Sequence, residues 1–159
     1  MQPVGTYKGL NYDGFNVINV GSAPLGVAAQ SKPNVVVTGL VSTGLTNTAT
    51  LKPASSKTAY FSLQSFYFGC VAATQESLAS VPTACSLTLT GKRKGKVVVT
   101  QQISFNPGLL ALNSPMKKQT FAGAWTNVDE IDFKQSSLLG AAAVAVLYDN
   151  FQYTTFTLN

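Results

Sequence analysis

Histidines and carboxylates, the side chains that most often carry acid/base and metal chemistry, are scarce in this chain. Its 159 residues include no histidine and six acids, which are Asp13, Glu76, Asp129, Glu130, Asp132 and Asp149. Acid/base catalysis near neutral pH usually draws on histidine or on tuned carboxylate pairs, and hydrolytic metal sites usually draw on histidine ligands. The composition therefore argues against an enzyme and favours a protein that binds a partner.

Glu130 and Asp132 belong to the one acidic cluster of the sequence. The alternation around them predicts that Ile131 and Phe133 face inward, which places both carboxylates on the outer side of a strand. A retaining glycosidase uses two carboxylates about 5 Å apart across a cleft, so this pair could serve glycoside hydrolysis. The sequence indicates no cleft, and we prefer the alternative of a solvated strand face.

Asp149, which is followed by Asn150, interrupts an apolar stretch of the sequence. A carboxylate in such surroundings must be paired, hydrogen-bonded or bound to a cation. One interpretation is a structural calcium held by Asp149, backbone carbonyls and Asp13, because calcium prefers oxygen ligands. The other is a bulge or corner in which backbone groups hydrogen-bond the carboxylate.

Four basic residues, Lys92, Arg93, Lys94 and Lys96, crowd into one short segment between two stretches with β-type alternation. The segment is predicted to be the tip of a β-hairpin. It could act as an electrostatic contact for anionic polysaccharide, phospholipid headgroups or nucleic acid, or it could be a solvated turn. The net charge of +5 is modest for a domain of this size, and we expect no nucleic-acid partner.

Exposed aromatic rings are the other feature that could bind a ligand, because the apolar face of a pyranose stacks on them. Tyr7, Asn11 and Tyr12 lie in a polar, glycine-punctuated segment and are predicted to form an exposed rim. Trp125 is a further candidate as a ligand platform. The alternative for Trp125 is packing in the core or at its edge.

Cys70 and Cys85 are the two cysteines, and they enclose a loop-like segment. In an oxidising compartment they form one disulfide, whereas in the cytosol they stay as buried thiols. Only 11% of residues are charged, which favours a secreted, extracellular or cell-wall protein. No signal peptide is recognised, and Met1 is interpreted as an initiator before a mature chain. The longest apolar run, 138–148, is about half of the roughly 20 residues that a membrane helix needs.

The elements that position these residues are predicted to be strands, because segments with period-two alternation are separated by regular turn signals. The predicted strands are 14–20, 34–40, 46–51, 58–68, 85–90, 96–105, 117–121, 128–133 and 143–158, with a bend near Asp149 in the last. We therefore expect residues 1–159 to form a single all-β domain, a two-sheet antiparallel jelly-roll-like sandwich with one disulfide.

Four motifs resemble those of small secreted proteins of filamentous fungi with jelly-roll sandwiches like those of carbohydrate-binding modules. The motifs are Tyr7–Phe15, Phe66–Cys70, Trp125–Phe133 and Val146–Tyr153, and they occur in the same order as in that group. The resemblance implies that the pair Asp149-Asn150 lies beside a structural calcium. Sugar-contacting residues vary within the group, so none is assigned from the resemblance.

The sequence thus predicts a secreted, non-catalytic module that binds cell-wall or host glycans through Tyr7, Asn11, Tyr12 and Trp125. A second hypothesis is a secreted effector or surface protein that binds a protein partner or an anionic surface through the basic hairpin. A third, which we favour least, is an enzyme that acts on glycosides with Glu130 and Asp132.

Overall fold

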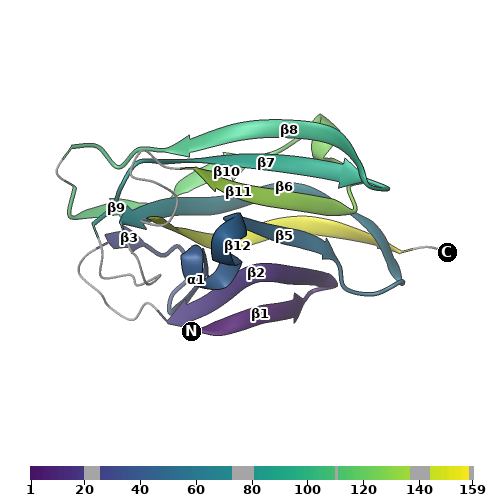
Figure 1. The fold of residues 1–159 in the computed structure, drawn as a ribbon, viewed down its shortest axis with the longest axis horizontal. Coiled ribbons are helices and arrows are strands. Elements are labelled where there is room, and N and C mark those ends of the chain that lie inside the picture. The colour runs from purple at the N-terminus through teal and green to yellow at the C-terminus, as the bar shows by residue number, and fades with distance from the viewer. Residues whose placement is uncertain (20–25, 73–80, 110, 137–143, 158–159) are drawn as a thin grey trace.

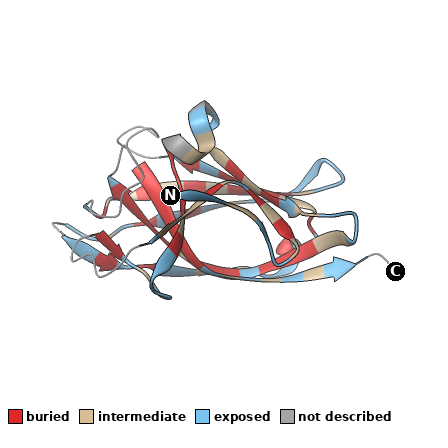
Figure 2. Ribbon diagram, turned by 90° about the horizontal axis from the view of Figure 1, so that it is seen from below, coloured by how far each residue is buried: buried red, intermediate tan, exposed pale blue. Residues whose placement is uncertain are grey.

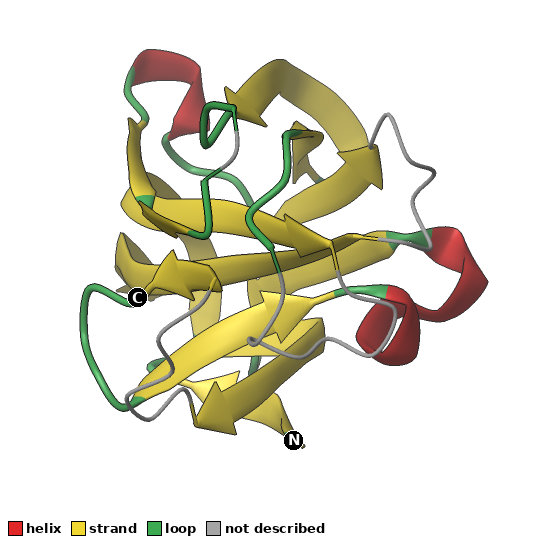
Figure 3. Ribbon diagram, turned by 90° about the vertical axis from the view of Figure 1, so that its left-hand side faces the viewer, coloured by secondary structure: helices red, strands yellow, loops and turns green. Residues whose placement is uncertain are grey.

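The computed structural model describes residues 1–19, 26–72, 81–109, 111–136 and 144–157, and nearly all of these lie in strands or tight turns (Figure 1). The strands are β1 (Gln2–Tyr7), β2 (Leu10–Asn19), β3 (Gly26–Ala28), β4 (Asn34–Thr38), β5 (Thr48–Pro53), β6 (Thr58–Ala72), β7 (Cys85–Arg93), β8 (Lys96–Phe105), β9 (Asn113–Pro115), β10 (Lys117–Thr120), β11 (Glu130–Ser136) and β12 (Val144–Thr157). Three short helical turns, α1 (Leu40–Thr43), η1 (Gly44–Thr46) and η2 (Gly123–Trp125), lie at the periphery (Figure 3). Among the described residues, no helix is long and apolar enough to cross a membrane.

One antiparallel sheet folds into two layers that meet at β2. Its strand order is β10-β6-β12-β4-β2-β5-β11-β7-β8, with β1 also paired to β2. Asn16 of β2 pairs with both β1 and β4, whereas Tyr12 pairs with both β1 and β5. β4 and β5 therefore lie end to end along one edge of β2, and β1 lies along the other. This arrangement confirms the predicted all-β antiparallel sandwich, and the shared strand brings it close to a closed barrel.

An aromatic cluster fills the interior between the layers. It comprises Phe15, Phe66, Phe133, Tyr148 and Phe151, whose ring centroids lie between 5.2 and 6.2 Å apart in nine pairs. Such pairs contribute about 0.5–1.5 kcal/mol each beyond the area that they bury. Figure 2 shows the buried positions along the strands and the exposed ones at several turns and at the end of β12.

The two longest strands, β6 and β12, form the central antiparallel ladder of one layer. Their register shifts between Asp149 and Gln152, where Asn150 has a positive φ of 51°. The bend that the sequence predicts at this point is thereby confirmed as a bulge. Its effect is that Tyr148 and Phe151, three positions apart, both stack in the core at a centroid distance of 5.6 Å.

A few contacts near Trp125 link the two ends of the folded sheet. Phe61 of β6 exchanges backbone hydrogen bonds of 2.8 and 2.9 Å with Val128. The Trp125 indole N–H donates to the Gln101 side chain of β8 at 3.0 Å. Lys117 of β10 donates to the Ser104 carbonyl of β8 at 2.8 Å. Side chains therefore bridge the gap that backbone pairing leaves open between β10 and β8.

The Cys70–Cys85 disulfide is confirmed, and it ties the end of β6 to the start of β7 with a Cα separation of 6.2 Å. Beside it, β3 and β9 form a separate parallel pair. Val27 of β3 packs on Gly69 of β6 so closely that a Cβ at Gly69 would lie 2.6 Å from Val27 Cγ1. Glycine at this position lets the small sheet rest directly on the large one.

Candidate binding groove

A groove runs along β12 where that strand leaves its neighbour β4. β4 pairs with β12 only over Val146–Tyr148, so the next part of β12 lacks this neighbour and faces the β1–β2 hairpin instead. The space between them is a cavity of about 400 Å³. The residues that line it are Val4, Tyr7, Lys8, Tyr12, Val17, Ser31, Asn34, Val35, Val36, Tyr148, Asp149, Asn150 and Phe151.

Tyr7 and Lys8 stand at the mouth of this cavity, on the tight turn of the β1–β2 hairpin. Tyr7 pairs with Leu10, and the two residues between them have positive φ values, 45° at Lys8 and 84° at Gly9. Two consecutive residues with positive φ are the signature of a type I′ hairpin turn, which fixes where both side chains leave the backbone. The Tyr7 side chain remains 53% exposed, and the Lys8 ammonium lies 5.3 Å from its ring centroid.

Tyr12 and Tyr153 attach this turn to β12. The Tyr12 hydroxyl donates to the Tyr153 hydroxyl at 3.2 Å, and the Tyr153 hydroxyl donates to the Tyr7 carbonyl at 3.1 Å. Burial raises the pKa of Tyr12 well above its ordinary value, and the bond with Tyr153 adds to the rise. Burial also raises the pKa of Tyr153. The phenols are therefore neutral at physiological pH and hold the hairpin against the strand.

Asp149 forms the inner wall of the cavity and is only 6% exposed. Its carboxylate accepts hydrogen bonds from the Ser31 backbone N–H at 2.7 Å, from the Ser31 hydroxyl, and from the Asn150 N–H at 2.7 Å. The carboxylate thus lies at a bulge and accepts hydrogen bonds from backbone N–H groups, the arrangement that the second interpretation describes.

Asp13, the second expected calcium ligand, is exposed on β2 opposite Thr50 of β5. Asp149 instead lies opposite Tyr67 of β6, on the neighbouring layer. Within the described part of the chain, no three histidine, cysteine, aspartate or glutamate residues group closely enough to hold a metal ion. The structure therefore does not bring Asp13 and Asp149 together in one site.

A second depression, of about 570 Å³, adjoins the first along β12. It is lined by Lys8, Gln64, Phe151, Gln152, Tyr153 and Thr155, so that Lys8, Phe151 and the strand β12 are common to both. Its polar groups are held in place, since Gln64 donates to Thr154 at 2.9 Å and Ser65 donates to Gln152 at 2.8 Å. We use the term β12 groove for the two depressions together.

The basic hairpin forms as predicted by the strand pattern, but most of its polar groups are already engaged. Lys92 Nζ lies 2.5 Å from Glu130 Oε1 and 2.6 Å from Asp132 Oδ2. The hydrogen bond to Asp132 raises the pKa of Lys92 above its ordinary value, and the hydrogen bond to Glu130 adds a smaller rise. Arg93 donates to the backbone carbonyls of residues 126 and 127.

The tip of the hairpin contributes the remaining cations. The Lys94 backbone N–H donates to Asp129 at 2.6 Å, while the side chains of Lys94 and Lys96 are exposed. Lys117 does not extend this positive surface, because it contacts Ser104, at the other end of β8 from Lys96. Eight residues of strand separate the two places by about 26 Å.

Glu130 and Asp132 lie on the same face of β11, as the alternation predicts, and both contact the ammonium of Lys92. Thr50 donates a further hydrogen bond to Asp132 at 3.0 Å. The two carboxylates are thus part of a cross-strand ionic network on the outer face of the sheet. They do not line the β12 groove.

Trp125 is packed into the closing edge of the sandwich and is 3% exposed. Its ring lies against Phe121 at a centroid distance of 5.2 Å, and its N–H is bound to Gln101. Neither ring face is available to a ligand, so the structure places Trp125 as the packing alternative describes.

Of the residues predicted to bind a ligand, the structure brings Tyr7 and Tyr12 together in the β12 groove, with Asp149 beside them. Tyr12 forms the buried floor and not an exposed rim, since it is 4% exposed. Asn11 lies between them in sequence but pairs with Lys52 on β5 and does not line the groove. Lys8 was not predicted as a site residue, although its place before Gly9 in a hairpin turn was a signal for an exposed, fixed cation.

No protein-family model matches the sequence, and no curated protein matches it. The fold is similar to that of a DUF4465 family protein from Bacteroides caccae, with a TM-score of 0.61, 11% identity, and coverage of 92% of this chain and 82% of that one. Weaker similarity links it to an adhesin domain of Lys-gingipain from Porphyromonas gingivalis, with a TM-score of 0.42, 10% identity and 92% coverage of each chain.

A Stig cyclase from Fischerella sp. is also similar, with a TM-score of 0.38, 14% identity, and coverage of 99% of this chain and 81% of that one. The last two TM-scores are too low to support any inference. The comparisons add no family-level support for the resemblance to secreted fungal carbohydrate-binding sandwiches. What they establish is that the chain shares its β-rich fold with the Bacteroides caccae protein.

Proposed function

We propose that this protein is a secreted, non-catalytic binding module that takes glycans in the β12 groove. The observation that carries the proposal is the exposed ring of Tyr7, fixed by a two-residue turn at the mouth of a concave, partly apolar site. Sugar sites combine such a ring with amide and hydroxyl groups that orient the sugar hydroxyls. Asn34, Asn150 and Gln152 supply exposed amides along the groove.

The proposal that the protein lacks catalytic activity follows from its side chains. The whole sequence has no histidine. Glu130 and Asp132 are tied to Lys92 and lie outside the groove, and Asp149 already accepts three hydrogen bonds. A disulfide between Cys70 and Cys85 suits an oxidising compartment, which supports an extracellular or cell-wall location. The sequence resemblance to secreted fungal sandwiches points the same way.

The alternative proposal, contact with a protein or an anionic surface through the basic hairpin, has less support. Lys92 and Arg93 are engaged within the protein, and Lys94 and Lys96 alone leave a small positive footprint at the tip. Binding through such a tip would fall steeply as salt rises.

Retention on insoluble chitin, β-glucan and cellulose, together with a soluble glycan array, tests the lead proposal. We expect Tyr7→Ala to weaken binding about tenfold, the effect of losing one aromatic contact. Phe156→Ala is the matched control, because it removes a 36% exposed ring that lies outside the groove and stacks on Tyr60. Absence of wild-type binding to every glycan, or equal effects of the two substitutions, would overturn the proposal.

A further inference from the structure

The two charges along the β12 groove differ in their exposure to a ligand. Among its lining residues only Lys8 and Asp149 are charged. Asp149 is buried and accepts three hydrogen bonds, so little of its charge is offered to a ligand. Lys8 is exposed and forms no ion pair with any described residue. The groove therefore presents a single accessible charge, and that charge is positive.

Lys8 is also the residue around which the groove is arranged. It lines both depressions, and its backbone position is set by the type I′ turn. The ammonium group lies 5.3 Å from the ring centroid of Tyr7, which holds it close to the proposed stacking surface. A ligand that stacks on Tyr7 would therefore meet a cation within the span of one sugar residue.

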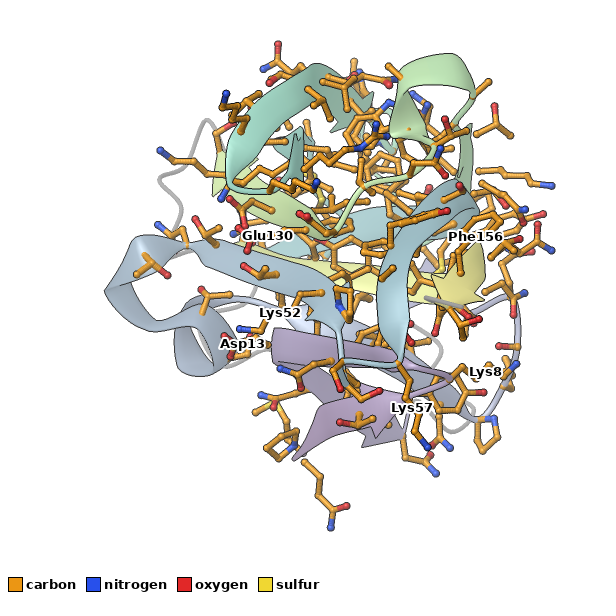
Figure 4. All side chains as sticks on the ribbon, turned by 90° about the vertical axis from the view of Figure 1, so that its right-hand side faces the viewer. Lys8, Asp13, Lys52, Lys57, Glu130 and Phe156 are labelled. Carbon is orange, nitrogen blue, oxygen red and sulfur yellow. A yellow bond between two sulfur atoms is a disulfide. The ribbon has the colours of Figure 1, made fainter. Side chains whose placement is uncertain are left out.

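Two further lysines flank this position. The Gly9 carbonyl accepts a hydrogen bond from the Ala54 N–H at 3.0 Å, which joins the β1–β2 turn to the β5–β6 turn that carries Lys57. Figure 4 shows Lys57 beside Lys8 on this end of the molecule, and Lys57 is exposed. At the other end of the groove, Lys32 is exposed next to Ser31, which lines the cavity.

The other described acids lie away from the groove. Asp129, Glu130 and Asp132 contact the basic hairpin, and Asp13 lies on β2 opposite Thr50. In Figure 4, Glu130 and Asp13 are seen away from Lys8 and Lys57. Asp149, which is buried and hydrogen-bonded, is thus the one described carboxylate at the groove, and the exposed Lys8, Lys32 and Lys57 outnumber it, which favours an anionic ligand.

We propose that the ligand of the β12 groove is an acidic glycan, a chain of uronate residues whose pyranose rings pack on Tyr7 and whose carboxylates bind Lys8. The inference rests on the proposed function, since it assumes that the groove takes sugar. A carboxylate accepts charge-assisted hydrogen bonds from an ammonium group, and the ring that bears it supplies the apolar face. One sugar residue thus satisfies both features of the site.

Polygalacturonate oligosaccharides and their methyl esters provide the direct test, because esterification removes the charge and keeps the rings. In calorimetry at low salt, we expect the acid form to bind at least tenfold more tightly than the ester. Lys8→Gln should remove that difference, and rising salt should reduce it. Tyr7→Ala should weaken both forms.

Lys94→Gln is the matched control for Lys8→Gln. Lys94 and Gly95 form the same kind of turn, with φ values of 50° and 74°, and the substitution makes the same change in net charge outside the groove. We expect it to leave uronate binding unchanged. An equal loss of affinity in both variants would overturn the inference and point to the basic hairpin.

The remaining outcomes also decide the matter. Equal binding of acid and ester, or binding of neutral polymers alone, would overturn the inference and leave glycan binding intact. Dextran sulfate that competes as well as uronate would show that charge alone is recognised, which also contradicts a uronate site. Failure of every glycan would remove the proposed function together with the inference.

Discussion

Ser31 donates both its backbone N–H and its hydroxyl to the carboxylate of Asp149, across 118 positions of sequence. This contact fastens the segment before β4 to the outer face of β12, beside the β12 groove. The carboxylate is 6% exposed, so these hydrogen bonds stabilise its charge in place of water. The carboxylate is in turn the acceptor that the Ser31 donors need.

Replacing Asp149 with alanine is expected to destabilise the protein by about 2–3 kcal/mol, because three donors lose a charged acceptor. Asp149→Asn keeps one acceptor oxygen and is expected to cost about half as much. The free energy of unfolding in urea measures both. Asp13→Ala, at an exposed position, is the control and should change stability by less than about 0.5 kcal/mol. A similar effect at both aspartates would contradict the role given to Asp149.

Calcium is expected to leave the melting temperature unchanged, because three hydrogen bonds already satisfy Asp149. A thermal melt with millimolar calcium and another with excess chelator measure this directly. A rise in melting temperature that depends on calcium and is lost in Asp149→Asn would establish instead the structural calcium that the sequence motif suggests.

Lys92→Met is expected to destabilise the protein by about 0.5–1 kcal/mol at neutral pH, the range for partly exposed ion pairs. Because the folded-state pKa of Lys92 is raised, its stabilisation is complete below the unfolded value near 10.4 and is lost as pH rises through the folded value. Urea unfolding at neutral and strongly alkaline pH measures the difference. Lys134→Met, an exposed position on β11, should have little effect. A wild-type advantage that persists in strong alkali would refute the assignment.

Tyr12 and Tyr148 are expected to resist ionisation until the protein unfolds, because burial raises the pKa of both phenols. A neutral phenol that is favoured in the folded state stabilises the fold below about pH 10, and this contribution is lost as pH rises further. Tyrosinate absorbance should therefore rise in two steps, the second coinciding with loss of circular dichroism. A single step near the ordinary pKa for all six tyrosines would disagree with the structure.

Reduction of the Cys70–Cys85 disulfide is expected to lower stability by about 3 kcal/mol, the entropy of closing a loop with a sequence separation of 15. The double variant Cys70→Ala, Cys85→Ala provides the same comparison without a reductant. Both cysteines are buried, so full alkylation of the unfolded chain must confirm that reduction was complete. An unchanged urea midpoint after confirmed reduction would show that the bond adds no stability.

Alternation predicted most strands because one face of each is apolar. The strand predicted over 96–105 is the observed β8, and Asp149 marked the bulge because a carboxylate interrupted an apolar run. β1 was missed because Gln2–Tyr7 contains a proline and a glycine and has no alternating apolar face. The segment is a strand because it pairs with β2, and this tertiary pairing cannot be predicted from the β-propensity of the segment itself.

The candidate site was harder to predict from the sequence than the strands. Trp125 packs beside Gly91, where a Cβ would lie 3.3 Å from its ring, and the two are distant in the chain. The neutralisation of Lys92 depends on the register between β7 and β11, which places Glu130 directly opposite it. Pairings of this kind follow from strand order, and alternation within one strand carries no information about its neighbours.

The central ladder between β6 and β12 cannot form until synthesis of the chain has passed β12. The ribosome delivers Thr58–Ala72 well before Val144–Thr157, yet these two strands pair along most of their length. Until the later strand emerges, the long edge of β6 is open to other strands of the same or another nascent chain. Productive folding of this protein is thus expected to depend on early shielding of one apolar strand.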